Sequence, residues 1–323
     1  MPTEPLAEAA VLGLDVGGTK IAASVFDAHL NPMISRTVPT PTACQPSALD
    51  AVAHNADAEA AARQRGRDAL LAAVTALCAD LLEQALGIQA IGVGIAGRVD
   101  TQRGLVVDAN DNLVGAKGAP IVEAVRNACH LPVYVDNDVR VMALAELQRG
   151  AARGMEHALC LTVGTGIGGA LIQNGEVWHG VHFCAGEVGY LYAGDGQTIE
   201  TLYSGPAIAR RFNARHGTNW TLKEMAARAA AGDAACADAI RAAADGLGRV
   251  LAPLIALIDP EAVIVGGGVA EIGALWWDAL LSAVRNAPVP AVSTIPMLPA
   301  AFGSQSGVFG AALLAAHRLG ILS

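Results

Sequence analysis

A glycine-rich turn with an acid before it and a lysine after it is the first feature of the chain that could do chemistry. The stretch Val11–Asp27 predicts a strand, a tight glycine turn and a second strand, because both flanking runs are apolar and rich in β-branched and small residues. Asp15 ends the first run, where a carboxylate can hold a hydrated Mg²⁺. The turn itself suits a phosphate, since glycine admits close backbone N–H groups and the next two residues add a hydroxyl and a positive charge: Gly17, Gly18, Thr19 and Lys20. A hairpin turn with an incidental acid and lysine explains this stretch equally well.

A second glycine turn follows about 150 residues later in the same kind of setting. His157–Val163 predicts a strand, Ala170–Gln173 predicts its partner, and the turn between them is Gly164-Thr-Gly-Ile-Gly-Gly169, with Gly164, Thr165 and Gly166 leading it. The repeat predicts two lobes of related topology, each with a phosphate-facing hairpin, although similar composition alone can produce such a likeness. The glycines also fit G-x-G-x-x-G, but a short strand follows them where a dinucleotide-binding fold needs a helix, so we reject that fold.

Three acids are candidates for the chemistry itself. Asp138 follows the predicted strand Pro132–Val135, beside Asn137, at a position that points a side chain into the crevice at the carboxyl end of a sheet. A carboxylate there also suits a helix N-cap, which spacing alone slightly favours. Glu187 and Glu200, each taken alone, are more typical of surface acids. A metal site from His179, His182 and Cys184 is the minority interpretation, because their spacing is loose.

Composition limits the classes of function. The chain has 323 residues, 53% of them hydrophobic, and a net charge of −9, which argues against nucleic acid or an anionic membrane as the main partner. The first ten residues lack the basic region of a signal peptide, and no apolar run is long enough to span a membrane. The six cysteines are scattered, as expected of free thiols in a reducing cytoplasm. Strands and helices alternate, which predicts an α/β fold.

A resemblance to a known family rests on seven motifs that occur in order between about residues 11 and 315: Asp15-Val-Gly-Gly-Thr-Lys20, Val135-Asp-Asn-Asp138, Ala145-Glu146, Leu161-Thr-Val-Gly-Thr-Gly-Ile-Gly-Gly169, Ala185-Gly-Glu-Val-Gly189, Ser204-Gly205 and Val265-Gly-Gly-Gly268. Together they resemble the ROK family of bacterial sugar kinases and repressors. The resemblance implies the actin/hexokinase-like (ribonuclease H-like) ATPase fold, with two α/β lobes around a cleft. We expect an N-terminal lobe of residues 1–135, with a C-terminal helix at 305–323 packing back on it, and a second lobe of residues 136–304.

The resemblance also implies roles, position by position. It makes Asp138 the general base for a sugar hydroxyl, and it makes hydroxyl-binding candidates of Asn112, Asn137, Asp138, Glu187 and Glu200. It implies that the hairpins at Gly17–Lys20 and Gly164–Gly169 face the ATP phosphates. It also implies that Gly266, Gly267 and Gly268 lie beside the adenosine and that Asp15 lies near Mg²⁺. The expected activity is ATP- and Mg²⁺-dependent phosphorylation of a hexose (glucose, a β-glucoside or N-acetylmannosamine) at its 6-hydroxyl, in a cytoplasmic homodimer.

One departure from the family concerns zinc. Many members have a His after G-E-x-G and then a C-x-C-G-x-x-G-C-x-E run, whereas this chain has Tyr190 at the His position and no cysteine in Leu191–Glu200. Both halves of the zinc site are lost together, so the sequence is similar to the zincless branch and predicts no structural zinc. Tyr190 is then a candidate for shaping the sugar pocket with its hydroxyl. Packing beneath the loop explains Tyr190 equally well.

Two other classes of protein share the family's sugar-binding body. A ROK repressor needs a helix-turn-helix domain ahead of the first hairpin, and the roughly ten acidic, proline-containing residues found there are too few for one. A sugar-binding protein without kinase activity is the alternative to the kinase. Retention of Asp138 and of both glycine turns argues against it.

Overall fold

The computed structural model describes residues 9–45, 47–50, 55–109, 111–194 and 196–321. The first eight residues and Asn110 lie outside this part. Contacts divide the chain into two compact units, Met1–Ala145 with Gln305–Ser323 and Glu146–Ser304. The division lies within one helix, ten residues beyond the boundary predicted at 135/136.

The first unit is built on a five-stranded sheet in the order β3-β2-β1-β4-β7. Its strands are β1 (Ala9–Val16), β2 (Lys20–Asp27), β3 (Pro32–Pro39), β4 (Ala90–Ile95) and β7 (Val133–Asn137), and a small two-stranded sheet is formed by β5 (Arg98–Asp100) and β6 (Leu105–Asp108). β2 runs antiparallel to both β1 and β3, whereas β4 and β7 extend the sheet from β1 in parallel. The carboxyl ends of β1, β4 and β7 therefore meet at one edge of the sheet.

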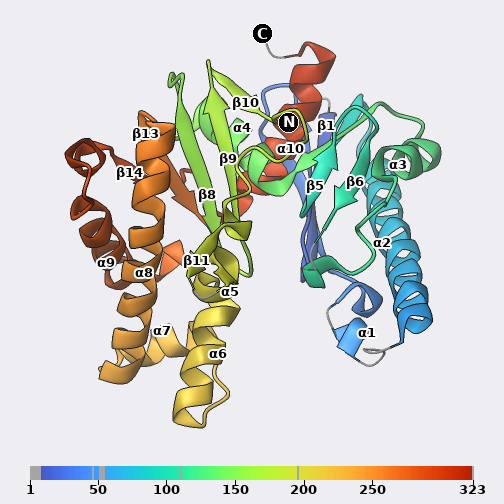
Figure 1. Cartoon of the computed structure of the whole chain (residues 1–323). Coiled ribbons are helices and arrows are strands. Elements are labelled where there is room, and N and C mark those ends of the chain that lie inside the picture. The colour runs from blue at the N-terminus through green and yellow to red at the C-terminus, as the bar shows by residue number, and fades with distance from the viewer. Residues whose placement is uncertain (1–8, 46, 51–54, 110, 195, 322–323) are drawn as a thin grey trace, which may run out of the picture. The chain divides into compact units, whose positions relative to one another are not determined.

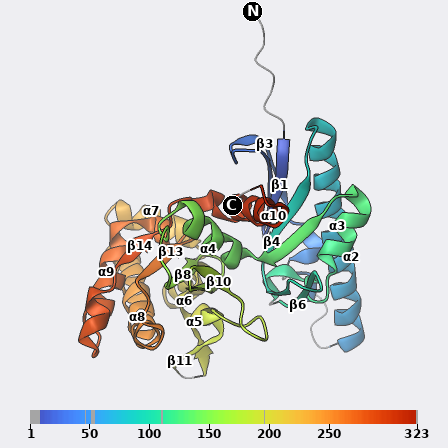
Figure 2. The same cartoon turned by 90° about the horizontal axis from the view of Figure 1, so that it is seen from above.

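Helices of the first unit cover both faces of this sheet. They are α1 (Ser47–Asp50), α2 (Ala56–Gln84), α3 (Ile121–Cys129), α4 (Asp138–Arg149, which continues into the second unit) and α10 (Ser306–Leu319). Leu12 and Leu14 of β1 pack with Leu70 and Val74 of α2 in one apolar core, and α3 lies beside α2 (Figures 1 and 2). Because alternate strand residues face opposite ways, Gly13 and Asp15 face α10 on the other side.

Glycine lets α10 approach the sheet closely. A Cβ added to Gly92 would lie 1.8 Å from the Ala311 carbonyl oxygen, and one added to Gly13 would lie 2.3 Å from the Val308 oxygen. Gly310 on the helix is equally crowded, at 1.8 Å from the Val141 oxygen. Backbone therefore packs directly on backbone here, with only methyl-sized side chains in the gaps, which fixes where the first turn of α10 lies.

The second unit repeats the topology of the first. Its sheet has the order β10-β9-β8-β13-β14, again with two antiparallel pairs followed by two parallel ones. The strands are β8 (Ala158–Val163), β9 (Ile167–Gln173), β10 (Glu176–Trp178), β13 (Ala262–Gly266) and β14 (Met297–Pro299), with a hairpin of β11 (Tyr192–Gly194) and β12 (Gln197–Thr198) outside it. The predicted pair of lobes with related topology is confirmed at the level of strand order and direction.

The second unit has its own set of helices. They are α5 (Ile199–Tyr203), α6 (Gly205–His216), α7 (Leu222–Ala230), α8 (Ala234–Ile258) and α9 (Ala274–Arg285), and 3-10 turns occur at Thr42–Cys44, Asp111–Leu113, Val188–Tyr190, Ala270–Ile272, Pro290–Thr294 and Gly303–Gln305. Leu247 and Leu251 of α8 and Trp276 of α9 pack with Leu161 of β8 in the apolar core. Within the described residues, no helix has the length and apolar character that a membrane span requires.

Candidate active site

Asp15 lies at the end of β1 and against the first turn of α10. A Cβ added to Gly307 would come within 2.6 Å of the Asp15 carboxyl carbon, so only glycine fits beside it. Burial and the negative charge of Asp138 raise the pKa of Asp15 to about 7, partly offset by the Lys20 ammonium. The charge of Asp138 reaches Asp15 because β1 and β7, the strands that lead to these two acids, both pair in parallel with β4 and end at the same edge of the sheet.

Asp138 is the first residue of α4, and its neighbour Asn137 makes the helix cap. The Asn137 Oδ1 accepts from the amides of Val139 at 2.9 Å and Arg140 at 3.1 Å. The Asn137 Nδ2 donates to the Gly97 carbonyl at 2.9 Å and to Asp138 Oδ1 at 2.8 Å. The slight preference for Asp138 as the cap was therefore wrong, because the preceding asparagine already supplies the acceptor that the first turn needs.

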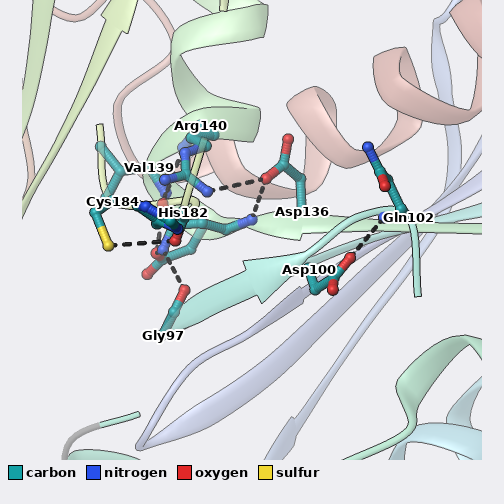
Figure 3. Close-up of polar contacts among 10 residues, drawn as sticks. Gly97, Asp100, Gln102, Asp136, Val139, Arg140, His182 and Cys184 are labelled. Atoms are coloured by element: carbon teal, nitrogen blue, oxygen red, sulfur yellow. Dashed lines mark hydrogen bonds and ion pairs between the residues drawn. The ribbon is translucent and has the colours of Figure 1, made fainter. Parts of the chain in front are cut away.

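The Asn137 bonds also bear on its predicted role. An amide side chain has two N–H donors and one oxygen with two lone pairs, and all four are used within the first unit. A sugar hydroxyl would have to replace one of these partners. Next to this residue, Asp136 and Arg140 form a buried ion pair at 3.7 Å (Figure 3), so the strand end and the helix start are held together.

The first glycine turn is fixed from three sides. The Gly17 amide donates to the Lys20 carbonyl at 3.1 Å, and the buried Thr40 hydroxyl donates to the Gly17 carbonyl at 2.6 Å. A Cβ on Gly18 would lie 2.3 Å from the Asn112 carbonyl oxygen, so this turn and the Asn112 backbone are in contact. The predicted hairpin is confirmed, with Lys20 as the first residue of β2 and exposed to solvent.

The second glycine turn is shorter than predicted. β9 begins at Ile167, so Gly168 and Gly169 are strand residues and the turn is Gly164–Gly166, closed by the Gly164 amide on the Gly166 carbonyl at 2.9 Å. The start of β9 pairs with the end of β8, Ile167 opposite Val163. Within the strand, Gly169 lets the Gly186 carbonyl come close, since an added Cβ would lie 2.5 Å from that oxygen.

The Gly266–Gly268 run lies against this second turn, so the structure brings these two predicted ATP-binding elements together. Gly267 has φ +90°, and a Cβ there would meet the Val163 carbonyl oxygen at 2.4 Å. The Val269 amide donates to the same carbonyl at 2.9 Å, and the Gly205 amide at the start of α6 donates to the Gly164 carbonyl at 2.8 Å. Glycine is thus required at 267 by both conformation and space.

Glu187 and Glu200 lie on the segment that packs beside β9. Gly186 and Gly189 flank Glu187 and both touch the strand backbone, since a Cβ on Gly189 would lie 2.0 Å from the Ile167 carbonyl oxygen. Glu200 in α5 accepts the Ile167 amide through Oε2 at 2.8 Å. Glu200 is therefore more than the surface acid that its isolated position suggested.

Tyr190 ends the 3-10 turn at Val188–Tyr190 and is 59% exposed. That exposure does not fit the interpretation in which Tyr190 only packs beneath the loop. After it, the β11–β12 hairpin occupies the stretch that has the cysteine run in zinc-containing relatives. Cys184 donates from Sγ to the His182 carbonyl at 3.2 Å (Figure 3), and no group of three or more potential metal ligands occurs among the residues that the structure describes. The absence of zinc itself stays a prediction.

A residue that sequence reasoning named only as part of a motif is Glu146. Its fully buried carboxylate accepts the Ala151 amide at 2.8 Å through Oε2, and the Ala301 and Phe302 amides at 2.9 and 3.3 Å through Oε1. These partners join the end of α4 to the segment after β14. Gly307, which makes room for Asp15, was missed as well, and no local signal marks it.

Comparison with known proteins identifies the class. The ROK family model matches residues 55–318, and this chain belongs to the ROK family. The glucokinase of Streptomyces coelicolor is 30% identical over 94% of this chain and 96% of its own length. The N-acetyl-D-glucosamine kinase of Yersinia pseudotuberculosis is 27% identical over 94% and 97% of the two chains.

Solved structures agree on the fold. The ROK family glucokinase of Streptomyces griseus, in complex with glucose and AMPPNP, superposes with a TM-score of 0.79 at 29% identity, over 95% of this chain and 99% of its own. A ROK family transcriptional regulator, a homologue of the E. coli MLC protein, has a TM-score of 0.77 at 21% identity, over 97% and 78%, so the fold alone does not separate kinases from regulators. The predicted actin/hexokinase-like α/β fold is confirmed by the ROK kinase structures.

Proposed function

We propose that this protein transfers the γ-phosphoryl group of ATP to the 6-hydroxyl of a hexose, with glucose as the first candidate. The observation that carries the proposal is the pair of acids at one sheet edge: Asp138, oriented by Asn137, and Asp15, whose pKa its surroundings raise to about 7. Similarity to glucokinases over nearly the whole chain supports the choice of glucose. N-acetylglucosamine is the second candidate, supported by the Yersinia kinase.

Asp138 would accept the proton of the sugar hydroxyl as that oxygen attacks the γ-phosphorus. Phosphoryl transfer needs positioning, neutralisation of charge and one proton acceptor, and little covalent chemistry from the protein. The donation from Asn137 Nδ2 and the Val139 amide to Asp138 Oδ1 fixes the carboxylate plane, so the base does not have to reorient during the reaction. In this proposal Asn112, Glu187, Tyr190 and Glu200 orient the sugar, and the turns at 17–20, 164–166 and 266–268 face the nucleotide.

Mg²⁺ would enter with ATP. Asp15 would hold the hydrated ion indirectly, through its water ligands, while the ATP phosphates would supply direct oxygen ligands. Bound Mg²⁺ would neutralise phosphate charge. The same proposal includes a homodimer in the cytoplasm, which sedimentation and cell fractionation would test.

The alternative is a sugar-binding ROK protein without kinase activity. A coupled ADP-release assay with Mg-ATP and a panel of glucose, mannose, fructose, allose, N-acetylglucosamine, N-acetylmannosamine and cellobiose separates the two. We expect one sugar to turn over well above the others, with glucose or N-acetylglucosamine leading. Folded protein that binds one of these sugars and releases no ADP would contradict the kinase and favour the alternative.

The role of Asp138 has its own test. Asp138→Asn should lower kcat by about 10³-fold or more, with a KM for sugar within a few-fold, because it removes the proton acceptor and keeps the side-chain shape. Asp80→Asn is a matched control in the first unit, since the Asp80 side chain is 54% exposed on α2. Wild-type-like turnover of Asp138→Asn would remove Asp138 from the base role.

A further inference from the structure

The backbone of Ile167, the first residue after the second glycine turn, faces the segment that carries the candidate sugar ligands. Its amide donates to Glu200 Oε2 at 2.8 Å. Its carbonyl oxygen abuts Gly189, where an added Cβ would be only 2.0 Å away. Both polar groups of this residue are thus directed at the stretch between Val188 and Glu200.

No residue of β10 lies opposite Ile167, so β10 provides no acceptor for the Ile167 amide. β10 pairs with β9 only at Leu171–Gln173, so the beginning of β9 extends past the end of its outer neighbour. A carboxylate from α5 takes the acceptor position that a longer β10 would have filled. An ionised acceptor makes this a charge-assisted hydrogen bond, roughly twice as strong as one between neutral groups.

The two ends of the turn are held in different ways. Val163 and Gly164 accept backbone amides from Val269 and Gly205, which lie on the side of the Gly266–Gly268 run. Ile167 is held by the side chain of Glu200. The position of one end of the turn therefore depends on a carboxylate, and anything that binds the same carboxylate acts on the turn.

We infer that Glu200 is a positioning residue that couples the sugar subsite to the phosphate-facing turn. One carboxylate oxygen holds the Ile167 amide, and the same carboxylate receives a sugar hydroxyl. The inference rests on the proposed function for the second part, the sugar contact. Sugar that fixes the Glu200 rotamer pre-orders the turn, so sugar and nucleotide bind with positive cooperativity, and by linkage each raises the affinity for the other by the same factor.

The experiment measures binding and exchange, not turnover. Titration calorimetry gives the Kd of AMPPNP with Mg²⁺, with and without saturating glucose, and hydrogen–deuterium exchange reports on the peptide spanning residues 163–170. The variants are Glu200→Ala, which removes the acceptor, and Glu200→Gln, whose amide oxygen keeps it. Glu224→Ala is the matched control, because Glu224 also accepts a backbone amide, that of Thr221 at 2.7 Å, in another helix of the same unit.

For the wild type we expect glucose to lower the Kd of AMPPNP by about fivefold or more. Glu200→Ala should raise the Kd of AMPPNP without sugar by about tenfold, abolish the effect of glucose and speed exchange in the 163–170 peptide. Glu200→Gln should keep slow exchange and near-wild-type affinity for AMPPNP while weakening sugar binding. Glu224→Ala should match the wild type in both measurements.

Unchanged AMPPNP affinity and unchanged exchange in Glu200→Ala would overturn the inference, as would equal losses in Glu224→Ala. These readouts without sugar remain valid if no sugar on the panel is phosphorylated, so failure of the kinase proposal is distinguishable from failure of this one. Absence of AMPPNP binding by the wild type would overturn both.

Discussion

Replacing Asp15 by asparagine should make the protein more stable at neutral pH while removing its activity. Burial and the charge of Asp138 raise the pKa of Asp15 from 3.8 to about 7. A tenfold change in a protonation equilibrium corresponds to about 1.36 kcal/mol, so ionising this carboxyl costs up to about 4 kcal/mol more in the folded protein than in the unfolded chain. The first turn of α10 beside Gly307 lowers that cost by about 0.3–1 kcal/mol, because a helix N-terminus favours an anion.

The sign of the pH dependence follows from proton binding. The folded protein holds the Asp15 proton more tightly than the unfolded chain, so this group favours folding least at high pH. Its penalty is absent below the unfolded pKa of 3.8, grows as the pH rises toward about 7, and is constant above that. Since partial exposure screens the charge, we expect Asp15→Asn to raise the free energy of unfolding by about 1–3 kcal/mol at pH 8 and by almost nothing at pH 4.

The assay is urea unfolding of wild type and Asp15→Asn between pH 4 and 8.5, without Mg²⁺ or nucleotide. Other titrating groups are common to both proteins and cancel in the difference. Asp80→Asn removes an exposed acid of the same unit and controls for the loss of one carboxyl group at the surface. A flat difference for Asp15→Asn, or destabilisation at pH 8, would refute the argument that ionised Asp15 destabilises the folded protein.

Further predictions concern residues that hold the site in place. Glu146→Ala should lower the free energy of unfolding by about 3 kcal/mol or more, because three backbone amides lose their acceptor, and Glu146→Gln should cost less since its amide oxygen still accepts. Gly92→Ala should cost about 2 kcal/mol or more in urea unfolding, because α10 must move away from the added Cβ, whereas Gly268→Ala, with nothing within 4 Å, should cost under about 1 kcal/mol. Elemental analysis of the purified protein should find no stoichiometric zinc; one zinc per chain would contradict the zincless prediction.

Elements with clear apolar patterning and characteristic turn residues could be predicted from the local sequence alone. The two glycine hairpins and the strand before Asp138 appear where apolar runs and turn residues predicted them. β3 was missed because it is an edge strand that begins and ends with proline and is mostly exposed, so it has no alternation of apolar and polar residues. β10, β11, β12 and β14 span at most three residues each, too few for a period to show.

The chemistry of the site was harder to predict, because it depends on contacts distant in sequence. The raised pKa of Asp15 arises from packing beside α10, near the end of the chain, and from Asp138, more than a hundred residues away. The Glu146 bonds to Ala301 and Phe302 span 155 and 156 residues. A motif can show that an acid belongs to a family pattern, but only the fold shows which amides it accepts.

Glycines at close backbone contacts determine where the acids of the candidate site lie. Gly13, Gly92 and Gly310 let α10 lie directly on the sheet, and that depth sets the distance between Asp15 and the first turn of the helix. In the second unit Gly189 and Gly267 let the backbone pack closely around the 164–166 turn. Glu200 accepts the Ile167 amide, which lies beyond the part of β9 that pairs with β10. In both units, close backbone packing at glycines sets where the acids lie, and hydrogen bonds to their side chains then orient the carboxylates. It follows that small substitutions at these glycines should disturb the acids more than conservative changes in the apolar core, although no glycine touches the reacting atoms.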